Sequence, residues 1–292
     1  MKTYNEVYIA ARNKLKAAGI DAYALEARLI AEYASGKTRE EYMTDGNLYA
    51  GAGFEEKIME LIERRVKEEP VAYITGEWEF YSLPMNVTPD VLIPRMDSEL
   101  LADKAIELLK SCGGQLRVMD LCCGSGCIGI AIASEVPGCR MVFVDESAKV
   151  LSVCRSNLAR NTLTRIASCV EADALAAPPM AMGQFDMIVC NPPYIPSADI
   201  MGLDTSVWKY EPITALDGGK DGLDFYRSIS SKWKCILRKG GALFFECGIG
   251  QSGDVADILK ANGFEAVAIY KDTLGIERVV AGVYTGGKEN GR

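Results

Sequence analysis

The chain has 292 residues, 49% of them hydrophobic and 25% charged, which is typical of a globular protein with room for one large domain and a smaller one. It contains no histidine, so serine–histidine–aspartate hydrolysis, cysteine–histidine proteolysis and histidine-ligated metal catalysis are excluded. Its formal net charge of -8 disfavours a nucleic-acid substrate, because proteins that bind nucleic acid usually present a basic face.

Residues 1–70 predict a small, all-helical domain. Helical patterns cover 4–20, 21–36 and 54–69, and Asp21 stands where it could cap the second of them. The first pattern lacks the uninterrupted apolar core of a signal peptide, and no apolar run approaches the roughly 20 residues of a membrane span. We therefore expect a cytoplasmic protein without a membrane partner.

Residues 71–95 predict a β-hairpin that links two domains. The stretch PVAYITGEWEFYSLPMNVTPDVLIP combines aromatic and β-branched residues with turn signals and four prolines. A pattern of this kind favours short strands and tight turns over helix.

Residues 96–292 predict an α/β domain, in which strand patterns alternate with helix patterns. The expected strands are 117–121, 140–145, one just before Asp173, 185–190, 242–247, 265–271 and 278–284. The expected helices between them are 98–112, 126–136, 147–161, 222–241 and 252–263. This alternation favours a doubly wound, mostly parallel, seven-stranded Rossmann-like sheet, and the two consecutive final strands favour an antiparallel edge.

In such a sheet, ligands bind beyond the carboxyl ends of the strands. The loop after the first strand holds a possible cofactor turn, formed by Cys122, Cys123, Gly124, Ser125 and Gly126. Gly124 and Gly126 would allow a tight turn and a close approach of the backbone to a ligand at the start of a helix. The turn lacks a full GxGxxG pattern, so an ordinary strand-to-helix connection also explains it.

Two acidic residues extend this candidate site. Asp145 ends the second strand about twenty residues beyond the glycines, where a carboxylate would bind the hydroxyls of a ribose. Asp173 follows the third strand, within reach of an adenine amino group. A helix cap and a solvated surface acid are the alternative interpretations. Together the acids and the glycine turn indicate an adenosine-containing ligand, either a nicotinamide cofactor or S-adenosylmethionine.

The sequence NPPY, residues 191–194, follows the fourth strand and favours S-adenosylmethionine. Each proline fixes its own φ and restricts the preceding residue, so Asn191 and Pro192 present carbonyl groups in set directions. A planar NH2 group could donate to the Asn191 side-chain oxygen and to the Pro192 carbonyl while its face rests on Tyr194. Both acceptors would bind more strongly as a methylated nitrogen becomes positive. The alternative is a rigid loop, including Pro193, that only ends a strand.

These motifs resemble those of a known family. NPPY in this place is similar to amino-methyltransferases that modify adenine, guanine or glutamine, and the whole chain resembles the release factor glutamine N5-methyltransferase (HemK/PrmC) family. The resemblance extends to the hairpin, to EPITALDGGKDGLDFYR at 211–227 and to DTLGIERVV at 272–280. DNA adenine methyltransferases share NPPY but generally lack the hairpin and ALDGGKDGLDFYR.

The resemblance implies methyl transfer from S-adenosylmethionine to the glutamine of the GGQ loop in class 1 peptide chain release factors, during translation. Residues 122–126, Asp145, the pair Asp173–Ala174 and Asn191 would contact the cofactor. Residues 191–194 would hold the glutamine amide, with Asn191, Pro192 and Tyr194 as the catalytic groups and Pro193 supporting them. The helices of residues 1–70 would help to dock the release factor. Two alternatives remain: an amino-methyltransferase acting on adenine N6 or guanine N2 in nucleic acid, and a non-catalytic S-adenosylmethionine-binding module.

The chain also departs from the family pattern. Cys122 replaces a usual glycine, which would demand a non-glycine backbone conformation, and Ala174 replaces a frequent aromatic residue, which would remove stacking on adenine. Both changes would lower cofactor affinity. Arg95 and Glu99 could act in the site or form a structural ion pair. Cys122, Cys123 and Cys127 could suggest a metal cluster, but no fourth ligand is evident, and we expect packing cysteines and no metal.

Overall fold

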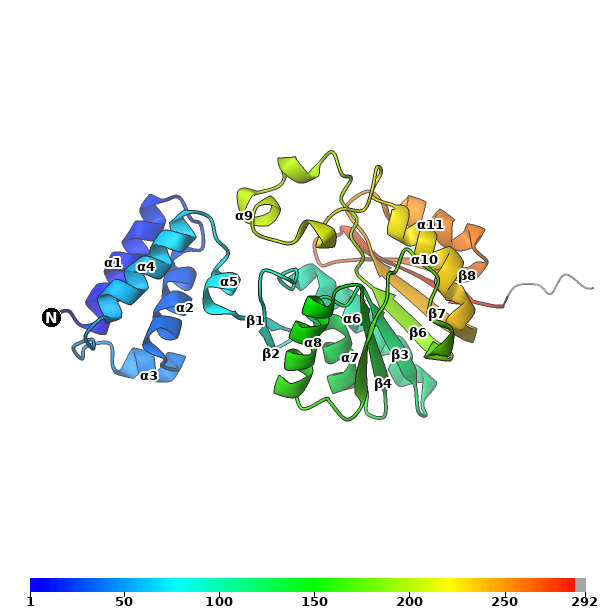
Figure 1. Ribbon diagram of the computed structural model, residues 1–292, viewed down its shortest axis with the longest axis horizontal. Helices are drawn as coiled ribbons and strands as arrows, with labels where there is room; N and C mark the ends of the chain where they lie inside the picture. Colours follow the sequence, from blue (N-terminus) through cyan, green and yellow to red (C-terminus); the bar gives the residue numbers. More distant parts are fainter. Residues whose placement is uncertain (287–292) are drawn as a thin grey trace, which may run out of the picture. The chain divides into compact units, whose positions relative to one another are not determined.

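The computed structural model describes residues 1–286, and Figure 1 traces them. The chain divides into two compact units. The first unit comprises Met1–Glu77 and Asp204–Tyr210, and the second comprises Trp78–Leu203 and the chain from Glu211 onward. Among the described residues, no helix has both the length and the apolar character needed to cross a membrane.

The first unit is helical, as predicted. Its helices are α1 (Tyr4–Ala17), α2 (Tyr23–Ser35), α3 (Arg39–Thr44), α4 (Phe54–Val66), α5 (Val71–Thr75) and α9 (Thr205–Trp208). Helix α1 begins at a capping box in which Thr3 and Glu6 satisfy each other's backbone N–H groups. Helix α2 ends at Gly36, which adopts φ +68°. Asp21 does not cap α2, because Ala22 occupies the N-cap position and makes no side-chain hydrogen bond there.

The core of the first unit lies between α1, α2 and α4. Their apolar stripes face one another, and the large side chains buried between them include Val7, Leu15, Ile30, Ile58 and Ile62. The segment 204–210 belongs to the same unit, and the Tyr210 hydroxyl donates a 2.7 Å hydrogen bond to the Lys67 carbonyl. A segment that follows the NPPY sequence by ten residues is thus part of the helical unit.

A two-stranded hairpin follows α5, formed by β1 (Glu77–Phe80) and β2 (Leu83–Asn86). Its two-residue turn, Tyr81 and Ser82, has φ values of +56° and +57°, which a type I′ turn requires and which glycine or asparagine usually supplies. Glu99 holds this turn by accepting a 2.8 Å hydrogen bond from the Tyr81 N–H. The expected hairpin is therefore present, although residues 71–75 of the predicted linker form a helix.

The hairpin is attached to the rest of the second unit by a buried amide. The Asn157 side chain accepts a 2.6 Å hydrogen bond from the Asn86 N–H and donates to the Asn86 carbonyl at 3.0 Å. It also donates to the Ser125 carbonyl at 2.9 Å. Because Asn157 is fully buried, all of these bonds are protected from water, and they connect β2 to the predicted cofactor turn.

The second unit is built on a seven-stranded sheet of order β5-β4-β3-β6-β7-β9-β8. The strands are β3 (Arg117–Leu121), β4 (Arg140–Asp145), β5 (Ala167–Glu171), β6 (Phe185–Cys190), β7 (Leu237–Glu246), β8 (Phe264–Lys271) and β9 (Glu277–Tyr284). Strands β3 to β7 pair in parallel, whereas β9 runs antiparallel to both β7 and β8. The predicted doubly wound sheet with an antiparallel end is confirmed.

Helices cover both faces of this sheet (Figure 1). They are α6 (Glu99–Cys112), α7 (Cys127–Glu135) and α8 (Ala148–Arg160) on one face, and α10 (Asp224–Lys232) and α11 (Ser252–Ala261) on the other. Neighbouring residues of β3 alternate between the two cores: Val118 packs with α6 to α8, and Met119 packs with α10 and α11. The loops that follow the carboxyl ends of β3, β4 and β6 therefore lie between helices of the two layers.

One predicted element is wrong. The helix expected over 222–241 ends at Lys232, and β7 already begins at Leu237. Leu237 pairs with Phe185 in β6, with a register shift before the next pair, so tertiary pairing overrides the local helix pattern. Trp233 lies in the short 3-10 turn between the two elements and is fully buried.

Candidate functional site

The turn after β3 curves through left-handed backbone conformations. Cys122, Gly124 and Gly126 have φ values of +57°, +54° and +83°. The expectation that Cys122 abandons a glycine-like conformation is wrong, since it retains that conformation at a strain of about 1–2 kcal/mol. A Cβ on Gly126 would lie 2.8 Å from the Cys154 sulfur, so glycine is also needed there for packing.

Asp145 ends β4 and fixes this turn. One carboxylate oxygen accepts a 3.1 Å hydrogen bond from the Gly124 N–H, and the other accepts a 3.3 Å bond from the Ser147 N–H. Burial raises the pKa of Asp145, and these N–H donors oppose the effect by favouring the charged form. The carboxylate can therefore hold the turn and still offer lone pairs to a ligand.

The loop after β5 places Asp173 and Ala174 at the same edge of the sheet. The Asp173 carboxylate accepts a 2.7 Å hydrogen bond from the Leu175 N–H, so it shapes its own loop. Ala174 is buried, and its carbonyl accepts a 3.1 Å hydrogen bond from the Trp233 indole. Phe225 of α10 lines the same cavity and supplies an aromatic group where Ala174 has none.

One cavity collects most of the predicted site residues. Its lining includes Cys122, Cys123, Gly124, Ser125, Asp145, Asp173, Ala174, Asn191 and Pro193. Gly126, Pro192 and Tyr194 are not among the lining residues. The carboxylates of Asp145 and Asp173 and apolar side chains such as Ile128 and Phe225 fit the hydroxyls, the amino group and the flat ring of an adenosine.

Asn191 enters this cavity at the end of β6. Its side-chain nitrogen donates a 3.2 Å hydrogen bond to the Ser98 hydroxyl, which belongs to the short turn before α6 and is 2% exposed. Because this bond directs the nitrogen toward Ser98, it leaves the Asn191 side-chain oxygen to accept a hydrogen bond from a substrate.

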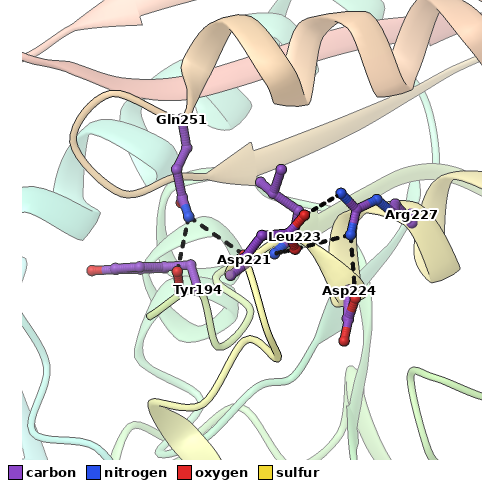
Figure 2. Close-up of polar contacts among 7 residues, drawn as sticks. Tyr194, Asp221, Leu223, Asp224, Arg227 and Gln251 are labelled. Carbon is purple, nitrogen blue, oxygen red and sulfur yellow. Dashed lines mark hydrogen bonds and ion pairs between the residues drawn. The ribbon is translucent and has the colours of Figure 1, made fainter. Parts of the chain in front are cut away.

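Gln251 holds the backbone of Tyr194 (Figure 2). Its side-chain nitrogen donates to the Tyr194 carbonyl at 2.9 Å, and its side-chain oxygen accepts from the Gly248 N–H at 3.0 Å. Gly222 closes the same contact, because a Cβ there would lie only 2.2 Å from the Tyr194 carbonyl oxygen. Burial also raises the pKa of Tyr194 to about 12, so its hydroxyl stays protonated near neutral pH.

The segment that carries Gly222 is fixed by charges at its surface. Arg227 binds both carboxylate oxygens of Asp221, at 2.5 and 2.9 Å, and also reaches Asp224 at 3.3 Å (Figure 2). The Arg227 hydrogen bonds lower the pKa of Asp221 to about 2. The segment 215–227, ALDGGKDGLDFYR, therefore packs against the Tyr194 backbone through Gly222 and helps to hold it in place.

Arg95 and Glu99, for which the sequence left two roles open, have different surroundings. Arg95 lines the cavity and forms an ion pair with Glu211, whose carboxylate also accepts a 3.1 Å hydrogen bond from the Ile93 N–H. Glu99 is not among the lining residues and binds the hairpin turn. Only Arg95 is thus placed for contact with a ligand.

Four residues near this site had escaped the sequence analysis: Ser98, Phe225, Glu246 and Gln251. Glu246 carried a signal in the sequence, because an acid follows directly after the apolar run ALFF at 242–245; in the structure it is 2% exposed. The other three belong to turns or helix starts, where polar or aromatic residues are common and carry no distinctive spacing.

Cys123 in the cofactor turn and Cys127 at the start of α7 are buried thiols, whereas Cys122 is partly exposed. Burial raises the pKa values of Cys123 and Cys127 to about 12, so both stay protonated near neutral pH. Within residues 1–286, no group of three or more cysteine, aspartate or glutamate side chains is arranged to hold a metal ion.

Asp120 gives a prediction for stability. It lies in β3 and is 1% exposed, with one oxygen accepting a 2.9 Å hydrogen bond from the Gly129 N–H and the other without a partner among the described residues. Burial raises its pKa to about 8, above the usual 3.8. The folded state therefore holds this proton more tightly, and the resulting stability is lost as the pH rises from about 4 to about 8.

We expect the free energy of unfolding of the wild type to fall by about 2–3 kcal/mol between pH 6 and pH 8.5 through this group. Asp120→Asn should remove that part of the slope, because asparagine does not ionise. Urea unfolding of both proteins at the two pH values measures the difference. Equal slopes would show that Asp120 is already ionised in the folded protein at pH 6.

Two domain families match the chain. The PrmC N-terminal domain matches residues 6–76, and the Methyltransferase small domain matches residues 97–202. Together they cover nearly all of α1 to α5 and the strands β3 to β6.

Individual proteins are similar over greater lengths. A release factor glutamine methyltransferase of Caulobacter vibrioides is 36% identical over 283 residues, 96% of each chain. One of Geobacter sulfurreducens is 40% identical over 222 residues, 76% of each chain. Among solved structures, the catalytic domain of hMettl16 aligns with a TM-score of 0.55 at 17% identity, over 71% of this chain and 77% of that one. This last likeness concerns the fold alone.

Proposed function

The chain belongs to the release factor glutamine methyltransferase family, and we propose that it transfers a methyl group from S-adenosylmethionine to the glutamine side-chain nitrogen in the GGQ loop of class 1 release factors. The observation that carries the proposal is the 36% identity across 96% of both chains. We place the reaction in the cytoplasm, since the proposed substrate acts in translation.

The cavity fits the proposed cofactor. Asp145 and Asp173 offer carboxylates for hydroxyl and amino groups, the tight turn at 122–126 allows the backbone to approach a ligand closely, and Phe225 and Ile128 offer apolar contacts. S-adenosylmethionine, when bound, supplies an electrophilic methyl group. No histidine is needed at such a site, because a methylated amide nitrogen is acidic enough to release its own proton.

The chain's own residues would act on the acceptor amide. The Asn191 side-chain oxygen and the Pro192 carbonyl would each accept one N–H, and the Tyr194 ring would support the flat face of the amide. Positive charge develops on the nitrogen as the new bond forms, so both acceptors bind it more strongly than they bind the planar amide. In-line positioning supplies the remaining acceleration.

The two other parts of the proposal concern partners. The helices of residues 1–70 would help to dock the release factor. Tyr33 in α2, Met43 in α3 and Tyr49 in the loop after α3 are exposed and offer apolar surface for such a contact. We propose that nucleic acid is not a substrate, because the net charge of -8 opposes binding of a phosphate backbone.

The test is methyl transfer from labelled S-adenosylmethionine to a purified class 1 release factor. We expect label on the wild-type factor and none on a factor whose GGQ is changed to GGA, nor on duplex DNA. Label on DNA, or equal label on both factors, would move the acceptor elsewhere. Tight cofactor binding without label on any substrate would favour a non-catalytic module.

A further inference from the structure

Glu246 lies next to Asn191 although the two residues are 55 positions apart in the chain. Strand β7 pairs with β6 so that Phe245 stands opposite Cys190, which places Glu246 and Asn191 at the same step beyond the pair. Glu246 is 2% exposed, and the Tyr226 hydroxyl fixes its backbone by donating a 3.0 Å hydrogen bond to its carbonyl. A buried acid therefore borders the residue proposed to hold the substrate amide.

The Glu246 carboxyl is surrounded by groups from several elements. Burial raises its pKa to about 7, and hydrogen bonding from Ser98, the Arg278 charge and hydrogen bonding from Asn191 oppose this, whereas Asp97 adds to it. Asp97 and Arg278 are themselves paired at 2.7 Å. The oxygen Oε2 of Glu246 has no hydrogen-bond partner among the described residues.

These contacts determine which end of the Asn191 amide faces the acceptor. Its nitrogen carries two hydrogens, and the partners beside it, the Ser98 hydroxyl and the Glu246 carboxylate, both accept hydrogen bonds. A reversed amide would bring the Asn191 oxygen against a buried carboxylate, which is repulsive in a low-dielectric site. The ionised acid thus keeps the nitrogen inward and the oxygen outward.

We propose that Glu246 is a positioning residue: together with Ser98 it holds the Asn191 nitrogen, so that the Asn191 oxygen is directed at the NH2 group to be methylated. This inference rests on the proposed function for the identity of that NH2 group. Glu246 and Asn191 lie side by side beyond the paired ends of β7 and β6 whatever the substrate is, so their coupling can be tested by itself.

The role depends on the charge of Glu246. Below about pH 7 the acid is protonated, becomes a donor as well as an acceptor, and no longer excludes the reversed amide. The turnover number of the wild type should therefore rise with pH through about 7. Tyr194 does not contribute to this transition, because its pKa is raised to about 12.

The first test observes the Asn191 side-chain amide by nitrogen NMR in protein labelled at asparagine. We expect its resonance to shift with a midpoint near pH 7 in the wild type and to stay constant in Glu246→Gln. Asp120→Asn is the matched control, because Asp120 is a comparably buried acid and should leave the Asn191 titration unchanged. A titration that persists in Glu246→Gln would overturn the proposal.

The second test uses kinetics with the release factor. Glu246→Gln should lower the turnover number about tenfold above pH 7.5 and abolish its pH dependence, with S-adenosylmethionine affinity within about twofold of the wild type. In an Asn191→Ala background, the same change should have no further effect, because Glu246 acts through Asn191. Multiplicative losses in the double variant would overturn the proposal.

Ser98→Ala provides a second reading if Glu246→Gln folds poorly. Removal of this hydroxyl should also lower the turnover number, and it should move the pH midpoint upward, because the Ser98 hydrogen bond is a contact that lowers the pKa of Glu246; an unchanged turnover number would count against the proposal. If the wild type labels no release factor but its Asn191 resonance titrates as expected, the proposed function fails and the positioning contact stands.

Discussion

Asn191→Ala should lower the turnover number for the release factor by roughly 10²- to 10³-fold, with little change in S-adenosylmethionine affinity. The loss has the size expected for removing one preorganised polar group that binds the reacting centre more strongly as its charge develops. The Asn191 side chain ends β6 and is held by Ser98, so its removal leaves the turn at 122–126 and Asp145 intact. Single-turnover kinetics and calorimetric titration with S-adenosylmethionine measure the two effects separately.

Asp145→Ala serves as the opposite control. It should weaken S-adenosylmethionine binding, because Asp145 lines the cavity and fixes Gly124, while a saturating cofactor concentration should restore most of the turnover. Normal turnover in Asn191→Ala would contradict the role given to the NPPY amide. A large loss of cofactor affinity in that variant would assign Asn191 to the cofactor more than to the acceptor.

Gly222→Ala should destabilise the protein by about 2–4 kcal/mol and also lower activity. The residue has φ +75°, and its new Cβ would lie 2.2 Å from the Tyr194 carbonyl oxygen and 2.6 Å from the Gln251 side-chain nitrogen. The clash would separate the two atoms whose 2.9 Å hydrogen bond holds the NPPY backbone. Urea unfolding and the methyl-transfer assay measure both consequences.

Gly240→Ala is the matched control for backbone strain. Gly240 has φ +85°, close to that of Gly222, but a Cβ there would meet no atom within 4 Å. It should therefore cost only about 1 kcal/mol and leave activity unchanged. Equal destabilisation in the two variants would mean that the Tyr194 loop moves aside at no energetic penalty, and that Gly222 is needed only for its conformation.

Much of the fold could be predicted because apolar periodicity reports burial directly. Strands β3, β4 and β6 are mostly apolar and are buried along most of their length, as expected for a parallel sheet covered on both faces. The segment 233–241 could not be predicted, because its apolar residues fit a helix equally well. What decides its structure is the pairing of Leu237 with Phe185, which lies 52 positions earlier in the chain.

Some residues of the site could also be predicted from the sequence, and others could not. Asp145 and Asn191 could be found because each follows a recognisable strand, and the carboxyl ends of parallel strands meet at one edge. Ser98 could not, since its contact with Asn191 joins residues 93 positions apart and depends on where α6 begins. Gln251 escaped for the same reason, because its partner Tyr194 lies 57 positions earlier.

The place of β9 in the sheet bears on how the protein is made. This strand is the last of the described sheet to leave the ribosome, yet it is inserted between β7 and β8 instead of being added at the edge. Until residue 284 is synthesised, β7 has an open edge, and Glu246 lacks the neighbouring strand that pairs with it at Val279. Folding of the second unit should therefore be completed late in synthesis. A ribosome-bound chain arrested before β9 should expose the unpaired edge of β7 to chaperones.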